Sequence, residues 1–82
     1  MSTAFIQKNI RLSLEFDTYA SRNPGVYDKI PNGSWVVLTV RGDEKFNRES
    51  RSTVGIAQIN KAKVIEARKE GSRWKIAKFV TA

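Results

Sequence analysis

The spacing of apolar residues predicts a long first helix. Ile6, Ile10 and Leu14 recur every four residues, which is the spacing of one face of an α-helix. Four further apolar residues widen this stripe: Phe5, Leu12, Phe16 and Tyr19. We therefore predict a helix over residues 4–22 that is broadly apolar for a lone amphipathic helix.

Turn-forming residues separate this helix from an apolar strand. Asn23 before Pro24 ends the helix, because the residue preceding a proline is driven out of the α region. We expect residues 24–30 to form a connection with a helical turn, and Pro-Asn-Gly at 31–33 to form a turn. The segment Trp-Val-Val-Leu-Thr-Val then predicts a strand within 34–41, placed centrally in a sheet because it is apolar on both faces.

The next segment predicts a second helix. Asp43 is a favourable N-cap, and Glu44 follows it where the helix dipole favours an anion. One face of this helix collects four small or apolar residues: Phe46, Ser50, Val54 and Ala57. We expect the helix to end near Asn60.

Residues 61–80 allow two interpretations. The chain could continue as a helix to Gly71 and then form one strand, or it could form a hairpin with strands at about 62–68 and 73–80. The hairpin is favoured because Arg-Lys-Glu-Gly at 68–71 fits a type I turn that ends in glycine. A helix would place Glu66 against Glu70, where like charges repel.

The predicted register of the hairpin pairs Val64 with Ile76 and Glu66 with Trp74. Val64, Trp74 and Ile76 then share the core face. Lys63, Arg73 and Lys75 share the opposite face. Both tryptophans, Trp35 and Trp74, are expected in the core. The whole chain, residues 1–82, is predicted to be one α+β domain, in which two helices pack on one face of a small, mostly antiparallel three-stranded sheet (order helix-strand-helix-strand-strand).

Three segments carry a resemblance: Asn-Ile-Arg-Leu-Ser-Leu-Glu-Phe at 9–16, Asn-Pro at 23–24, and Asp-Lys-Ile-Pro-Asn-Gly-Ser-Trp-Val-Val at 28–37. Over about residues 5–40 the chain resembles a family of small uncharacterised prokaryotic proteins, with the Asp-Lys-Ile-Pro block as the distinctive part. Beyond residue 40 it departs, because Arg-Gly-Asp-Glu-Lys stands at 41–45 where the resemblance implies an acidic loop. The resemblance supports the first half of the fold and implies no activity.

Composition narrows the possible chemistry. The 82 residues include no histidine and no cysteine, which removes the usual general base, the usual nucleophile and the zinc ligands. No phosphate-binding loop occurs, and the spacing of Asp43, Glu44 and Glu49 does not fit a calcium loop. We therefore expect a protein that is not an enzyme and has no cofactor or metal. A chain without disulfides, a secretory leader or an apolar run of about 20 residues is expected in the cytoplasm.

The charge is unevenly distributed. The chain has 15 basic and 8 acidic residues, net +7; four basic and three acidic residues lie in 1–40, and eleven basic and five acidic in 41–82. A basic surface attracts phosphates, so DNA or RNA is one candidate partner. The candidate phosphate contacts are Arg48, Arg51, Lys63, Arg73 and Lys75, and Phe79 is a candidate for stacking on bases. The same charges could form only a solvated face that keeps a small protein soluble.

The function favoured by the sequence is a non-enzymatic binding module for protein–protein or self-association, with sequence-neutral nucleic-acid binding as the alternative. Small domains often gain stability by pairing, and the surplus apolar surface of helix 4–22 could meet a second copy. A membrane surface is disfavoured as a partner, because this helix carries three cations and two acidic residues.

Overall fold

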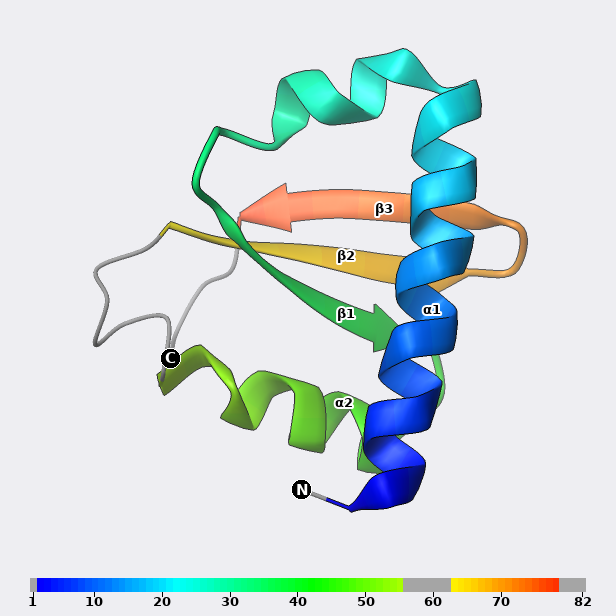
Figure 1. The fold of residues 1–82 in the computed structure, drawn as a ribbon, viewed down its shortest axis with the longest axis vertical. Coiled ribbons are helices and arrows are strands. Elements are labelled where there is room, and N and C mark those ends of the chain that lie inside the picture. The colour runs from blue at the N-terminus through cyan, green and yellow to red at the C-terminus, as the bar shows by residue number, and fades with distance from the viewer. Residues whose placement is uncertain (1, 56–62, 79–82) are drawn as a thin grey trace.

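The computed structural model describes residues 2–55 and 63–78. The elements are α1 (Thr3–Arg22), a 3₁₀ helix η1 (Pro24–Lys29), β1 (Trp35–Val40), α2 (Glu44–Ser52), β2 (Val64–Glu70) and β3 (Arg73–Lys78). Their order confirms the predicted order, and residues 64–70 are a strand, as the hairpin interpretation required. Figure 1 shows α1 crossing one face of the sheet, η1 beyond β3 and α2 beside β1.

The ends of α1 follow from local side chains. The Ser2 hydroxyl accepts a hydrogen bond from the Phe5 amide at 3.1 Å, which caps the first turn. At the other end, the Asn23 amide donates to the Ala20 carbonyl at 3.1 Å. Pro24 then opens η1, where its missing N–H costs nothing because the first amides of a helix lack partners within it.

The sheet is mixed, in the order β1-β2-β3. β1 runs parallel to β2, with Leu38 beside Ala67, and β2 runs antiparallel to β3, with Ala67 beside Ile76. The α+β class is confirmed, but the sheet is not mostly antiparallel as predicted. The reason is that α2 lies between β1 and β2 in the chain, and a helical crossover of this kind joins parallel strands.

β1 lies at the edge of the sheet and not at its centre, which corrects the sequence prediction. Val37 and Leu38 are both buried although they point to opposite faces. Helix α2 lies along the free edge of β1 (Figure 1). The Asn47 side chain accepts from the Val40 amide at 2.7 Å and donates to the Val40 carbonyl at 2.8 Å. This amide replaces a neighbouring strand, so an edge strand can be as apolar as a central one.

The hairpin register differs from the predicted one by three residues. Ile76 pairs with Ala67 instead of Val64, and Trp74 pairs with Lys69 instead of Glu66. The turn is a two-residue loop at 71–72 and not the segment 68–71, because Gly71 takes a φ of 65° that suits a tight hairpin. An odd shift exchanges the two faces of β2, so Glu66 turns away from the core.

The second predicted helix is interrupted after Ser52, because Thr53 is a turn residue, and Val54 and Gly55 are again helical. α2 begins after the Asp43 cap, whose carboxylate accepts from the Phe46 amide at 3.1 Å, and ends at Ser52. The predicted inner face is confirmed for Phe46, Ser50 and Val54, all of which are buried. Ala57 and Asn60, in the predicted continuation, lie outside the described residues.

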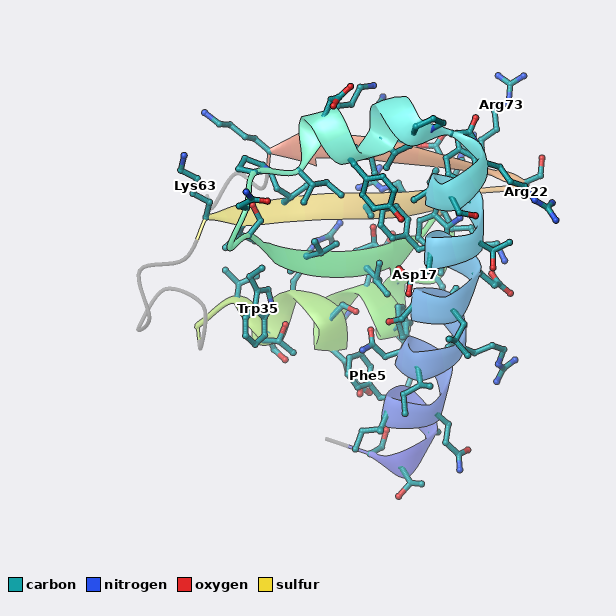
Figure 2. All side chains as sticks on the ribbon, turned by 45° about the horizontal axis from the view of Figure 1, so that its top comes forward. Phe5, Asp17, Arg22, Trp35, Lys63 and Arg73 are labelled. Atoms are coloured by element: carbon teal, nitrogen blue, oxygen red, sulfur yellow. The ribbon has the colours of Figure 1, made fainter. Side chains whose placement is uncertain are left out.

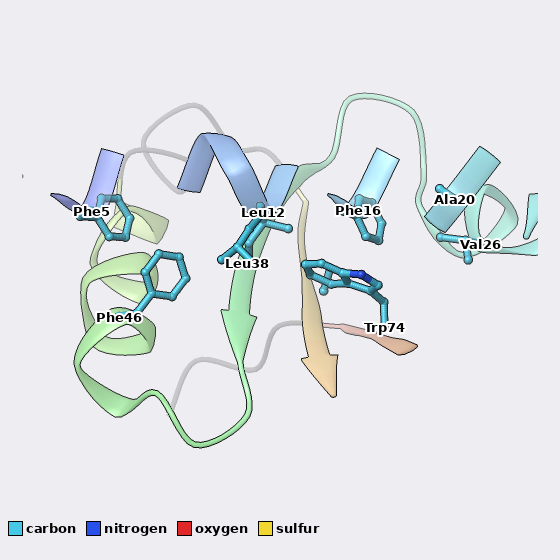
Figure 3. Packing of buried hydrophobic residues seen from close by; sticks show 9 residues of the cluster. Phe5, Leu12, Phe16, Ala20, Val26, Leu38, Phe46 and Trp74 are labelled. Atoms are coloured by element: carbon cyan, nitrogen blue, oxygen red, sulfur yellow. The ribbon is translucent and has the colours of Figure 1, made fainter. Parts of the chain in front are cut away.

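The core is a row of apolar side chains between α1 and the sheet. Figure 3 shows this row running from Phe5 and Phe46 past Leu12 and Leu38 to Phe16 and Trp74, and on to Ala20 and Val26. The Phe16 and Trp74 rings meet edge to face with centroids 5.1 Å apart. Trp74 therefore lies in the core as predicted, whereas Trp35 is only half-buried.

Candidate protein interaction surface

Helix α1 buries one apolar face and exposes another. The buried residues are Phe5, Leu12, Phe16 and Ala20. Ile6, Ile10 and Leu14, called here the α1 stripe, are 46%, 56% and 64% exposed. The sequence predicted one broad apolar stripe, and the structure divides it: Phe5, Leu12 and Phe16 fill the space above the sheet, while the α1 stripe faces outward.

The side of α1 that carries the stripe is nearly free of charge. Consecutive members of the stripe are about 40° apart around the helix, and Thr3 and Asp17 lie within about 20° of Ile10. Asp17 is thus the one charged residue of α1 on this side of the helix. In Figure 2, Asp17 and Arg22 project from opposite sides of α1. An exposed helix face with three large apolar residues and one charge is unlike a solvated face.

The α1 stripe borders a groove on the sheet. A hollow of about 240 Å³ is lined by Ile6 and Ile10 of α1, by β1 from Trp35 to Leu38, and by Ser50 and Thr53 at the end of α2. Ser50 is buried, and its hydroxyl has no hydrogen-bond partner among the described residues. Two members of the stripe, Ile6 and Ile10, therefore border the hollow together with the half-buried Trp35 and Val36.

Ion pairs fix α1 to its neighbours on the shoulder away from the stripe. The Lys8 ammonium pairs with the Asp43 carboxylate at the start of α2 and lies 5.2 Å from the centre of the Phe46 ring. Glu15 pairs with Lys69 of β2. The hydrogen bond from Lys8 lowers the pKa of Asp43, and the Phe46 amide acts in the same direction. These partly exposed ion pairs join α1 to α2 and to β2.

The predicted phosphate contacts do not form one surface. Lys63 lies at the start of β2, whereas Arg73 lies in the hairpin at the other end of the sheet (Figure 2). Six residues of strand separate Lys63 from the end of β2, or roughly 20 Å. Arg73 and Lys75 are exposed on the same face of β3, as predicted. The alternation of side chains along β2 places Lys63 on the opposite face of the sheet.

Two of the cations on the sheet face opposite α1 are held by one carboxylate. Glu66 accepts from the Thr39 hydroxyl at 2.8 Å and from Arg68 at 3.1 Å, and the Arg51 guanidinium lies 3.7 Å away. Thr39 is fully buried and the Glu66 side chain is only 15% exposed. Sequence reasoning missed this cluster because the wrong register placed Glu66 toward the core.

The remaining predicted residues are dispersed. Arg48 is exposed on α2, away from β3, and Phe79 lies outside the described residues. On the sheet face opposite α1, Glu70 lies directly across from Arg73 in the strand register. The face therefore alternates acidic and basic side chains instead of presenting a row of cations.

Within residues 2–55 and 63–78, no group of three acidic, histidine or cysteine side chains is placed to hold a metal ion. In the same part of the chain, none of the helices has the length and apolar character that a membrane span requires. The apolar surface around α1 is thus the most distinctive feature of the described residues.

Comparison with known proteins places the chain in a family. A model of a family of unknown function, DUF5647, matches residues 4–80. The chain belongs to this family. The DUF5647 match extends over both halves of the chain, so the basic second half is part of the family domain although the resemblance noted from the sequence stopped near residue 40. Searches of curated proteins and of solved structures gave no significant match.

Proposed function

We propose that this protein is a non-enzymatic binding module that associates with a protein through the α1 stripe and the adjoining groove. The observation that carries the proposal is the exposure of Ile6, Ile10 and Leu14 on a helix whose other face is already packed on the sheet. Large apolar side chains gathered on one exposed surface mark sites of protein contact.

The arrangement also favours a preformed docking surface over one that becomes ordered only on binding. α1 is held by its aromatic core residues and by ion pairs at both Asp43 and Lys69, so the stripe is presented on a rigid element. A preformed surface loses less conformational entropy on binding than a flexible one. The groove beside Trp35 adds a concave region into which a side chain of the partner can fit.

A pull-down with matched variants tests this proposal. Ile10→Glu places a charge at the centre of the α1 stripe, whereas Tyr27→Glu places the same charge at an exposed apolar residue of η1, outside α1. We expect immobilised wild type and Tyr27→Glu to retain the same protein from a nuclease-treated extract, and Ile10→Glu to lose it. Equal retention by all three proteins, or by none, would contradict the proposal.

Sequence-neutral nucleic-acid binding is the second candidate, because the net charge is +7 and Arg73 and Lys75 share an exposed face. It ranks lower because Glu66 and Glu70 interrupt that face. Fluorescence anisotropy with labelled DNA and RNA tests it at about 50 mM salt, where phosphate contacts are strong. Binding whose affinity falls as salt rises would support it, provided that this salt dependence is weaker in an Arg73→Glu/Lys75→Glu variant. The absence of binding would reject it.

We also propose a cytoplasmic location and a prokaryotic origin. The first rests on a sequence without cysteine, which suits a reducing compartment. The second rests on the resemblance of residues 5–40, in which the Asp-Lys-Ile-Pro block at 28–31 is the distinctive part. Fractionation of the source cells checks the location.

A further inference from the structure

We infer that the partner of the α1 stripe is a second copy of this chain, with the two α1 helices packed antiparallel about a two-fold axis at Ile10. The inference rests on the proposed function and adds the identity and orientation of the partner. It follows from the symmetry of the stripe, from the position of Asp17 and from the separation of the stripe from the cations of α1.

The α1 stripe is self-complementary in the antiparallel direction. Ile6 and Leu14 lie four residues before and after Ile10, about 6 Å along the helix on either side. A two-fold axis at Ile10 therefore sets Ile10 against Ile10 and Ile6 against the Leu14 of the other copy. Every large apolar residue of the stripe then meets another, as an isologous interface requires.

The charge on the same face is complementary as well. Asp17 lies seven residues after Ile10 and Thr3 lies seven residues before it, so the axis places Asp17 at the N-terminus of the other α1. That terminus has no acidic residue in its first turn, and Ser2 accepts hydrogen bonds from the Phe5 and Ile6 amides but not from those of Thr3 and Ala4. The partial positive charge of the remaining amides favours a carboxylate there. The single charge beside the stripe thus has a favourable position in the dimer.

The cations of α1 avoid this interface. Lys8 is bound to Asp43, and Arg11 and Arg22 lie about 100° or more around the helix from Ile10. Two copies with a net charge of +7 repel each other at long range, so contact is most favourable through an uncharged face. Salt screens this repulsion, and we expect the dimer to persist when salt rises from about 50 mM to about 500 mM. Nucleic-acid binding would weaken over the same range.

The size of the surface predicts a reversible dimer. A helix of 20 residues is about 30 Å long and about 10 Å wide, which gives a contact of order 300 Å² per copy. Trp35 and Val36 in the groove enlarge it, but a standard interface buries roughly 800 Å² per partner. We therefore expect a dissociation constant on the order of 10 µM or weaker.

Analytical ultracentrifugation from about 10 µM to about 500 µM tests for the second copy, a range chosen around the affinity expected from the contact area. The wild type and Tyr27→Glu, which places the same charge at an exposed apolar residue of η1 and outside α1, are expected to shift toward twice the monomer mass, and Ile10→Glu is expected to stay monomeric. A circular dichroism spectrum and an urea titration establish that Ile10→Glu is folded. A wild type that remains a monomer at the highest concentration overturns the inference.

Single cysteines test the orientation, because the natural chain contains none. Ile10→Cys is expected to form a disulfide-linked dimer on mild oxidation, since the two-fold axis brings both copies of this residue together. Ile6→Cys and Leu14→Cys are each expected to cross-link poorly alone, because like residues would lie about 12 Å apart along the helices. A mixture of the two should cross-link efficiently. Self-linking at all three positions would indicate parallel helices and reject the arrangement.

The two proposals can fail separately. If the protein is monomeric at 500 µM but captures another protein through Ile10, the proposed function stands and the inference of a second copy as partner is rejected. A protein that neither dimerises nor shows Ile10-dependent capture loses both. A dimer that Ile10→Glu leaves intact uses another surface and also overturns the inference.

Discussion

The two helices of this protein differ in what they bury and in what they expose. α1 is attached to the sheet through aromatic and aliphatic side chains, yet its solvent side carries the α1 stripe. α2 is attached partly through polar groups, since Asn47 and Ser50 are buried beside Phe46. Its solvent side is polar and charged, formed by Glu44, Lys45, Arg48 and Ser52.

This difference shows which helix has a surface left to cover. α2 has the usual division of a surface helix, with its exposed side suited to water. α1 has two apolar sides, and the sheet covers only one of them. Its exposed apolar residues cannot be explained by a need for core packing, because Phe5, Leu12 and Phe16 already fill that space. The following substitutions test whether only the buried side of α1 stabilises the folded monomer.

The largest difference is expected between two neighbouring residues on opposite sides of α1. Phe16→Ala removes a buried ring that contacts Trp74 and should lower the free energy of unfolding by about 3–5 kcal/mol. Leu14→Ala removes an exposed side chain and should change it by less than about 0.5 kcal/mol in the monomer. Urea titrations at low protein concentration measure both. Similar losses for the two variants would mean that the stripe packs within the monomer.

For α2, the polar attachment is tested at Asn47. Asn47→Ala leaves the amide and the carbonyl of Val40 without their partner at the free edge of β1. Unpaired groups of this kind cost about 1–3 kcal/mol, so we expect a loss of about 2 kcal/mol in a urea titration. Arg48→Ala, at the next and exposed position, is the control and should fall within about 0.5 kcal/mol. A loss no larger than that of the control would show that water replaces the Asn47 amide.

Where the two helices meet, the Phe5–Phe46 contact can be isolated by a double-mutant cycle. The ring centres lie 5.2 Å apart, and aromatic pairs at this distance contribute about 0.5–1.5 kcal/mol beyond their burial. The cycle compares Phe5→Leu, Phe46→Leu and the double variant in urea titrations. We expect a coupling energy of about 1 kcal/mol. Additive losses would show that each ring is held by the sheet and not by the other helix.

The sequence predicted the features that depend on neighbouring residues and missed those that depend on contacts between distant segments. Local signals gave the element order, the Asp43 cap and the alternation of Trp74 and Ile76 in β3 correctly. The register of the hairpin was missed because glycine at 71 suits both the end of a type I turn and the start of a two-residue loop, and in the structure it starts the loop, which makes Ala67 a buried residue. The hairpin register cannot be determined from sequence periodicity alone.

The candidate site shows the same limit. The spacing of Ile6, Ile10 and Leu14 is an unambiguous helical stripe, but spacing cannot tell which of two apolar stripes faces the sheet. Shape decides it here, because the aromatic rings at positions 5 and 16 reach Phe46 and Trp74. The edge position of β1 was hidden in a similar way, since the Asn47 contact that replaces a strand comes from another element.

The smallest expected effect concerns the ion pair that joins the two helices. The hydrogen bond from Lys8 and the bond from the Phe46 amide hold the pKa of Asp43 below its ordinary value, with Lys45 adding a weaker attraction. A carboxylate with a lowered pKa in the folded state stabilises the fold above its unfolded pKa, near 3.9, and this contribution is lost as pH falls through the lower folded value.

Asp43→Asn keeps a cap of similar strength but removes the charge. We expect the variant to be slightly less stable than wild type at pH 7 and equal to it well below pH 4, as measured by urea titrations at several pH values. In a Lys8→Gln background the difference should shrink at pH 7, because the main cause of the lowered pKa is absent. A difference that stays constant down to pH 3 would mean that Asp43 acts only as a cap, and that the aromatic contact and the sheet, without this ion pair, hold α1 against α2.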